Sequence, residues 1–273
     1  MKQLTGTIFK YFFLLAWLFI CLYPLLTVLF GSFKSYEEFN ASSGLALPES
    51  LNLANYQQAF QQGKILTGFV NTFILVFCGV VGSVLIGSMT AYILNRFDFP
   101  FKKLLIGGYF LLSMVPMVVS QISTFRIIVA LGWYDRLIAP VIIYLGADVV
   151  MIFIYLQMYE KIPRELDKAA LLEGASYFQV YWKVLFPLLS PATATVSMLK
   201  MISIYNDFYL PFLYLPGEKH GTVATALYRF IGPNQTNWQV ICALLVISVL
   251  PMLLFYLVLQ KYIYNGLAGG VKG

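Results

Sequence analysis

Long apolar runs separated by short polar segments dominate the chain. Six such runs, each close to the roughly 20 residues that cross a bilayer as a helix, occupy residues 11–30, 68–94, 104–122, 137–159, 188–209 and 238–262. The first run is too long for a signal-peptide core and lacks small residues at cleavage spacing behind it, so we expect it to remain in the mature protein. The pattern predicts an all-α polytopic membrane protein whose six transmembrane helices form one domain over residues 1–273.

The distribution of lysine and arginine predicts the orientation of these spans. With the N-terminus inside, the inner segments hold eleven basic residues and the longer outer segments hold six. The inner residues are Lys2, Lys10, Arg96, Lys102, Lys103, Lys161, Arg164, Lys168, Lys183, Lys261 and Lys272, and the outer ones are Lys34, Lys64, Arg126, Arg136, Lys219 and Arg229. The excess on the inside predicts that both termini, and the segment 160–187, lie in the cytoplasm.

Composition agrees with a lipid environment and excludes several classes of function. With 60% hydrophobic and 11% charged residues, a soluble globule would expose large apolar patches. The net charge is +6, but the basic residues are scattered along the chain and form no basic stripe, so no nucleic acid partner is expected. The three cysteines, Cys21, Cys78 and Cys242, lie in apolar runs without metal-ligand spacing, so we expect no metal site.

The segment 160–187 carries the strongest local signals. Pro163 suits a first helical turn and Gly174 supplies a left-handed residue that ends the helix. Ser176 and Gln179 then have the spacing of a capping box. These residues predict a short helix, an elbow at Gly174, and a second helix that runs to Pro187 and the membrane.

The predicted short helix has a flat apolar face and a basic edge. Leu166, Ala169 and Ala170 fall at i, i+3 and i+4, and Lys161, Arg164 and Lys168 fall on a neighbouring edge. A flat face allows another backbone to approach closely, and an unpaired basic edge favours an acidic partner. Docking on a second protein and contact with anionic lipid headgroups are both consistent with this pattern.

A family resemblance favours docking. Lys168-Ala169-Ala170, followed at fixed spacing by Gly174, Val184 and Phe186-Pro187, resembles the EAA loop of type I binding-protein-dependent ABC importer permeases, whose pattern is E-A-A-x3-G-x9-I-x-L-P. Lys168 stands where that family has glutamate, and Phe186 where it has leucine. Asp167 and Glu173 are candidates for the missing acidic group.

The resemblance extends along nearly the whole chain to the maltose-permease type, specifically the smaller second permease subunit of carbohydrate systems. The segments that carry it are 23–34, 91–100, 162–166, Asn206-Asp207-Phe208 with Pro211, and the tail 266–273. Their order and spacing together are specific, although each one alone is weak.

The resemblance implies the partners and a division of labour. In that family the permease forms a heterodimer with a second permease subunit in the bacterial cytoplasmic (inner) membrane, and each subunit places its EAA helix in a cleft of a cytoplasmic ATPase subunit. An extracytoplasmic solute-binding protein delivers a carbohydrate or related solute. The resemblance implies that this chain holds no cofactor, that the two partner ATPase subunits bind ATP and Mg, and that Arg164, Asp167, Lys168, Ala169, Ala170, Glu173, Gly174 and Pro187 take part in ATPase coupling.

Catalytic signals agree with a non-catalytic subunit. The sequence contains no G-x-x-x-x-G-K-[ST] loop that would cradle nucleotide phosphates. The single histidine, His220, lies in a polar segment where a solvated surface residue is the simpler interpretation. We therefore expect no enzymatic activity in this chain.

Polar residues inside the apolar runs are candidates for a solute pathway or a subunit interface, because charges there are costly. Thr193, Ser197, Lys200, Ile204 and Asp207 share one helical face, Asp148 lies in the fourth run, and Tyr205 and Asn206 adjoin the face. Packing at an interface, with Lys200 paired to Asp148 or to a partner carboxylate, and lining of the pathway both remain open. An ion-coupled secondary transporter that uses Asp148 and Lys200 is the alternative function, and which solute is carried stays open.

Overall fold

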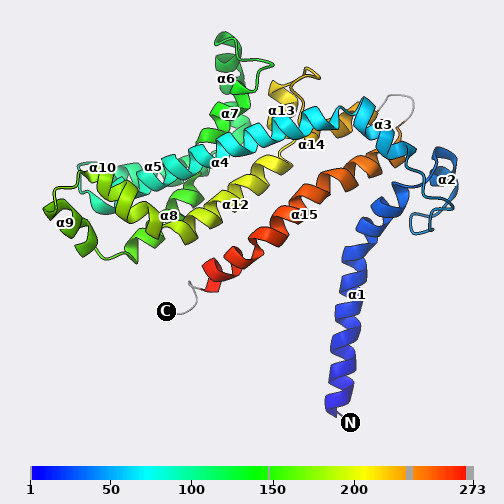
Figure 1. The fold of residues 1–273 in the computed structure, drawn as a ribbon, viewed down its shortest axis with the longest axis horizontal. Coiled ribbons are helices and arrows are strands. Elements are labelled where there is room, and N and C mark those ends of the chain that lie inside the picture. Colours follow the sequence, from blue (N-terminus) through cyan, green and yellow to red (C-terminus); the bar gives the residue numbers. More distant parts are fainter. Residues whose placement is uncertain (1, 147, 232–235, 269–273) are drawn as a thin grey trace. The chain divides into compact units, whose positions relative to one another are not determined.

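The computed structural model describes residues 2–146, 148–231 and 236–268, which are mainly helical (Figure 1). Across these ranges the one strand-like pairing is an isolated bridge between Ile231 and Thr236. The chain divides into two compact units, one made of residues up to Gly68 with Thr225–Phe255, and the other of Phe69–Ala224 with the residues from Tyr256 on. Of the tail segment 266–273 that carries part of the family resemblance, residues 269–273 lie outside the described residues.

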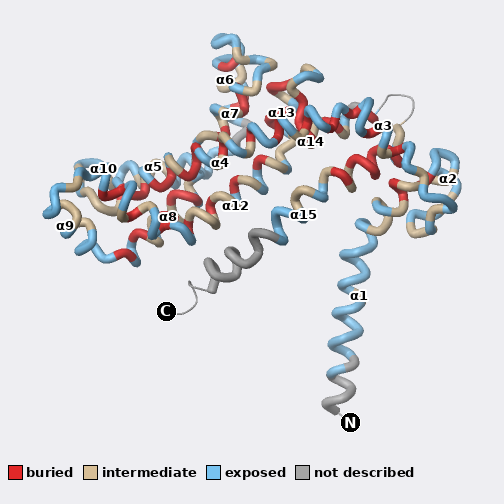
Figure 2. Tube along the Cα trace, viewed as in Figure 1, coloured by how far each residue is buried: buried red, intermediate tan, exposed pale blue. Residues whose placement is uncertain are grey.

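The first unit combines membrane helices with a small polar core. It contains α1 (Lys2–Gly31), α2 (Tyr36–Ala41), α3 (Ala54–Gln62), η2 (Leu227–Phe230) and most of α15 (Trp238–Ala268). Lys34 is 2% exposed, and its Nζ donates to Ser42 Oγ at 2.8 Å and to the Ser43 carbonyl at 2.9 Å. The apolar part of α1 is exposed along its length (Figure 2), which is stable only where the surroundings are themselves apolar.

The second unit contains the remaining helices. These are α4 (Ile65–Arg96), whose first residues belong to the first unit, α5 (Lys102–Ser113), α6 (Met117–Ala130), α7 (Ile138–Leu145), α8 (Val149–Glu160), α9 (Glu165–Leu172), α10 (Tyr177–Gln179), η1 (Val180–Leu185), α11 (Phe186–Leu188), α12 (Ser190–Asn206), α13 (Tyr209–Tyr214) and α14 (Val223–Ala226), the last crossing the boundary. Tyrosines from α4, α8 and η1, namely Tyr92, Tyr155, Tyr159 and Tyr181, are buried together in one core. A second core joins α4, α7, α12 and α13 around Tyr144, Ile204 and Tyr214.

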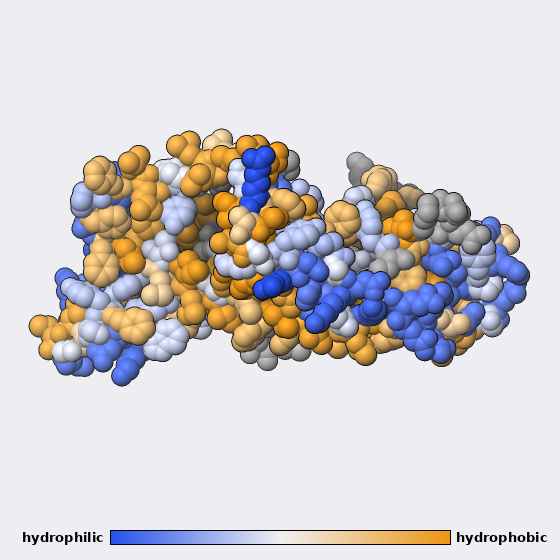
Figure 3. All heavy atoms as spheres, turned by 90° about the horizontal axis from the view of Figure 1, so that it is seen from above, coloured by the Kyte–Doolittle hydropathy of each residue, from blue (hydrophilic) through white to orange (hydrophobic). Residues whose placement is uncertain are grey.

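Three helices of the described chain are long and apolar enough to cross a membrane. They are Phe9–Gly31, Ile65–Arg96 and Trp238–Leu257, and the number rises to five if each of two bent helix pairs counts as one span. Figure 3 shows orange apolar residues over much of the visible surface, with patches of blue hydrophilic residues between them. The protein is therefore membrane-integral.

The expected span 104–122 is not one continuous helix. The chain leaves α5 after Ser113 and starts α6 at Met117, with Pro116 extended at φ −59° and ψ 134°. Proline lacks an N–H and disfavours helical geometry in the residue before it. Hydropathy alone detects the apolar run but not this interruption.

The expected span 137–159 is also interrupted, whereas the expected span 188–209 runs as α12 to Asn206 and is bent only where it begins. Gly146 and Asp148 are extended between α7 and α8, and the freed carbonyl oxygens of Tyr144 and Gly146 accept hydrogen bonds from Ser83 Oγ at 3.2 and 3.1 Å. Such breaks are tolerated in membranes where other groups satisfy the backbone. The helical segment Tyr177–Leu188 bends by 79° relative to α12.

Candidate functional site

The candidate site is the elbow at Gly174, which joins α9 to the following helical segment. Gly174 has φ +87°, its N–H donates to Leu171 O at 3.0 Å, and the Ala175 N–H donates to Ala170 O at 3.0 Å. This pair of bonds is a Schellman motif, which satisfies the last carbonyls of a helix. The predicted left-handed stop at Gly174 is confirmed.

The segment after the elbow begins with the predicted capping box. Gln179 N–H donates to Ser176 Oγ at 3.3 Å, and the Ser176 N–H donates to Gln179 Oε1 at 2.8 Å. The sequence predicts one helix from here to Pro187, whereas the structure shows α10, the π-helical turns of η1 and then α11. Pro187 cannot donate a backbone hydrogen bond, and local π turns can satisfy backbone groups that a proline frees.

Side chains of α9 and its C-terminus divide into an inner and an outer set. Ala170 and Leu171 pack against the tyrosine core. Lys168, Ala169 and Glu173 are exposed, and Leu172 is 90% exposed. Of the predicted face, Leu166 (41% exposed) and Ala169 are exposed, whereas Ala170 packs inward. The most exposed apolar side chain is Leu172, which the prediction did not include although it follows Ala169 at i+3.

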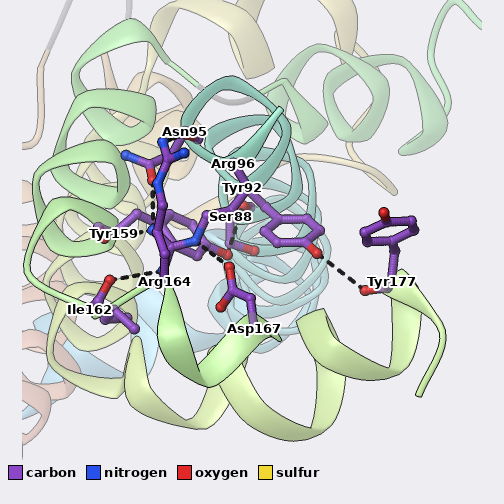
Figure 4. A network of polar contacts seen from close by, with 9 residues as sticks. All are labelled: Ser88, Tyr92, Asn95, Arg96, Tyr159, Ile162, Arg164, Asp167 and Tyr177. Carbon is purple, nitrogen blue, oxygen red and sulfur yellow. Dashed lines mark hydrogen bonds and ion pairs between the residues drawn. The ribbon is translucent and has the colours of Figure 1, made fainter. Parts of the chain in front are cut away.

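A polar network, which we call the α4–α9 clamp, connects the end of α4 to α9 (Figure 4). Arg96 Nε lies 2.6 Å from Asp167 Oδ2, and these side chains are only 6% and 14% exposed. Arg96 Nη2 donates to Ile162 O at 2.9 Å and Nη1 to Tyr159 O at 3.4 Å, while its guanidinium lies 5.7 Å from the Tyr159 ring centre. In the opposite direction, from the start of α9 to the end of α4, Arg164 Nη2 donates to Asn95 O at 2.8 Å.

The clamp changes the roles of two predicted residues. Burial raises the pKa of the Asp167 carboxyl, and the Arg96 guanidinium opposes that rise. Asp167 is engaged inside the chain, whereas Glu173 stays exposed. Arg164 contacts the carbonyl of Asn95 in place of standing unpaired on a basic edge. Of the remaining predicted residues, Pro187 lies in α11, away from this network.

The polar residues predicted within the apolar runs form three separate contacts in the chain. Lys200 Nζ lies 3.3 Å from Asp148 Oδ2 and donates to Gly146 O at 3.1 Å, so within this chain Lys200 makes the first of the two pairings that the sequence left open. Tyr155 Oη donates to Thr193 Oγ1 at 3.2 Å, and Tyr144 Oη donates to Asp207 Oδ2 at 2.8 Å.

The other members of the predicted stripe are less engaged in these contacts. Ser197 and Tyr205 are half-buried, and Asn206 Nδ2 donates to Ile202 O within its own helix at 2.9 Å. The Lys200 side chain is 6% exposed, whereas that of Asp148 is 59% exposed. Asp148 therefore presents a charged group outward at the α7–α8 break. Nowhere in the described ranges do three His, Cys, Asp or Glu side chains gather as metal ligands.

Sequence reasoning missed Arg96 as a site residue. It registered only as one of the inner basic residues and as part of the resembling segment 91–100. Its partner Asp167 lies far along the chain, and no local spacing connects the two. The available signal was an arginine at the end of a long apolar run, which also suits a topological role.

Comparisons with known proteins give one family. The model of the family described as "Binding-protein-dependent transport system inner membrane component" matches residues 83–268. The chain is 31% identical to a probable ABC transporter permease protein, YurM, of Bacillus subtilis, with 100% of this chain and 91% of that protein covered. It is 29% identical to the melibiose/raffinose/stachyose import permease protein MelC of the same species, with 93% and 92% covered.

A further relative and two solved structures extend the comparison. The probable starch degradation products transport system permease protein AmyC of Thermoanaerobacterium thermosulfurigenes is 30% identical, with 91% of each chain covered. A chain of a bacterial ABC transporter involved in the import of the acidic polysaccharide alginate matches with a TM-score of 0.84 at 22% identity, covering 96% of this chain and 98% of that one. A chain of the MetNI methionine ABC transporter matches with a TM-score of 0.54 at 17% identity, covering 77% and 98%. These likenesses show the fold that the sequence resemblance implies.

Proposed function

The chain belongs to the family of binding-protein-dependent transport system inner membrane components, the permease subunits of ABC importers, and we propose that it forms part of the path of an ATP-driven carbohydrate importer. The solute class is supported by relatives whose names refer to melibiose, raffinose and stachyose or to starch degradation products, and which align over at least 91% of this chain. Within this class we propose an oligosaccharide.

The single observation that carries the coupling role is the exposed, rigidly held end of α9. Leu172 is 90% exposed while its neighbour Leu171 packs inward, and the Schellman motif and the capping box fix the elbow on either side. A helix held in this way passes on displacement that a loop would absorb. We propose that Lys168, Ala169, Leu172 and Glu173 contact a cytoplasmic ATPase subunit, and that Ala170, Gly174 and Pro187 shape the segment that carries them.

The proposal includes the arrangement of the complex. This subunit pairs with a second permease in the bacterial inner membrane, two ATPase subunits bind ATP and Mg, and an extracytoplasmic protein delivers the solute. The basic residues of segment 160–187 favour a cytoplasmic α9, and with it both termini inside. Six crossings require α5 and α6 to form one interrupted span, with α7–α8 as another. No specific observation favours the ion-coupled alternative.

Uptake by a reconstituted complex tests this function. The complete complex in proteoliposomes, with its solute-binding protein, is supplied with internal ATP and with radiolabelled raffinose or maltotetraose outside. We expect ATP-dependent accumulation of one of these probes. Accumulation of neither sugar would contradict the oligosaccharide assignment, and uptake that persists with catalytically inactive ATPase subunits would contradict ATP coupling.

A further inference from the structure

The coupling segment is attached to the membrane helices at three places. Two attachments are covalent: residues 161–164 join α8 to α9, and α10, η1 and α11 lead into α12. The third is the α4–α9 clamp. We propose that Arg96 and Asp167 are positioning residues that transmit displacement of α9 into α4, an inference that rests on the proposed coupling function.

The geometry of Arg96 suits such a link. Its guanidinium contacts the carbonyl oxygens of Tyr159 and Ile162 at the end of α8. It also contacts the carboxylate of Asp167 on α9. The planar, rigid fork of arginine fixes directions as well as charge, which lysine does not. Arg164 ties the start of α9 back to Asn95 O, so α9 and the end of α4 are joined by two side chains that reach in opposite directions.

The energetics of the pair also favour a mechanical role over simple stabilisation. The Asp167 side chain is 14% exposed, and neither its Oδ1 nor Arg96 Nε has a hydrogen-bond partner among the described residues, so the two side chains are joined by charge at 2.6 Å. A buried ion pair whose oxygens are incompletely satisfied adds little net stability compared with apolar packing. What such a pair does provide is a fixed direction between the two elements that carry it.

From the clamp, α4 leads to the break between α7 and α8. No proline interrupts α4, and Ser83 lies about 20 Å from Arg96 along the helix axis. Ser83 Oγ donates to the carbonyl oxygens of Tyr144 and Gly146 at that break, and the second of these also accepts from Lys200.

Close packing reinforces this end of α4. A Cβ at Gly79 would overlap Ile204 Cδ1 of α12, and one at Gly82 would overlap Leu145 Cδ2 of α7. Because tight packing transmits displacement, α4 joins the coupling helix to the region of Asp148 and Lys200. This route is separate from the covalent connection into α12.

The proposal is tested in the reconstituted complex with Asp167→Asn and Arg96→Lys. Asp167→Asn preserves shape and removes the charge, and Arg96→Lys keeps the charge and removes the fork. The matched control is Asp98→Asn, which breaks the exposed Asp98–Lys102 pair just beyond the end of α4. The readouts are basal ATP turnover, the amount of assembled complex, and the amount of sugar imported per ATP hydrolysed, with whichever probe the wild-type complex imports.

We expect the sugar imported per ATP to fall at least about fivefold in Asp167→Asn, in line with typical coupling free energies. The ratio for Arg96→Lys should lie between that of Asp167→Asn and that of the wild type, and the ratio for Asp98→Asn should equal that of the wild type. Basal ATP turnover and the amount of assembled complex should be unchanged in all three variants. An unchanged ratio in both clamp variants, or a loss of uptake that only follows a loss of assembled complex, would overturn the proposal. Absence of uptake by the wild-type complex would instead refute the proposed function.

Discussion

Replacing Gly174 with valine should uncouple the elbow without disturbing the rest of the chain. A Cβ at Gly174 meets no heavy atom within 4 Å, so the β-carbon of a substituted residue causes no steric overlap. The cost comes from the backbone, because φ is +87° and an L-residue in the left-handed region loses about 1–2 kcal/mol. A penalty of this size lowers the equilibrium ratio of the native elbow to alternative conformations by about 5- to 30-fold.

The assay is ATP-driven sugar uptake by the reconstituted complex, normalised to assembled complex. Gly132→Val is a matched control, because Gly132 also has a positive φ, of +69°, and a Cβ there would also meet no heavy atom within 4 Å, yet this residue lies between α6 and α7. We expect Gly174→Val to lose most uptake while inserting and assembling normally, and Gly132→Val to retain uptake. Equal uptake by the two variants would refute the reasoning, since the backbone strain would then have no specific consequence at the elbow.

Three further predictions concern the cap, the ion pair and the solute. Ser176→Ala removes the capping-box acceptor and should lower the stability of the elbow by about 1 kcal/mol. Uptake should then be inactivated at a lower temperature, and less sugar should be imported per ATP hydrolysed. Ser35→Ala, which removes the cap of α2, should leave the sugar-to-ATP ratio unchanged. Lys200→Met should destabilise the complex more when Asp148 is present than in an Asp148→Asn background, with a coupling free energy of at least about 0.5 kcal/mol in thermal unfolding; strict additivity would exclude the pair as an energetic unit. An oligosaccharide at about 100 times its Kd should stabilise the cognate solute-binding protein by about 2.7 kcal/mol, and a melting temperature that no oligosaccharide raises would exclude this solute class.

Local signals predicted the elbow correctly because all of its determinants lie close together. Gly174 ends α9 through bonds to carbonyls within five residues, and Ser176 and Gln179 satisfy each other across one turn. Short-range chemistry of this kind is readable from sequence. The same holds for the existence of the long apolar helices α1, α4 and α15, which follow from hydropathy.

Features that depend on tertiary packing were not predictable in the same way. The break at Pro116 has a local cause, a proline that hydropathy does not register, whereas the break at Gly146 is stabilised by Ser83 and Lys200 from other helices. The inward packing of Ala170 and Leu171 depends on tyrosines from α4, α8 and η1, and this packing turns Leu172 outward. The Lys200–Asp148 pair was foreseeable because an intramembrane cation requires a partner.

The central claim, that the exposed end of α9 docks on an ATPase subunit, is tested most directly by photocrosslinking from Leu172→p-benzoylphenylalanine in the assembled complex in a bilayer. Leu112, which is 70% exposed in α5, provides the matched control position. We predict a crosslinked product between this chain and the ATPase subunit from position 172 and none from position 112. Crosslinking of position 172 to lipid alone would contradict the claim and place α9 on the membrane surface.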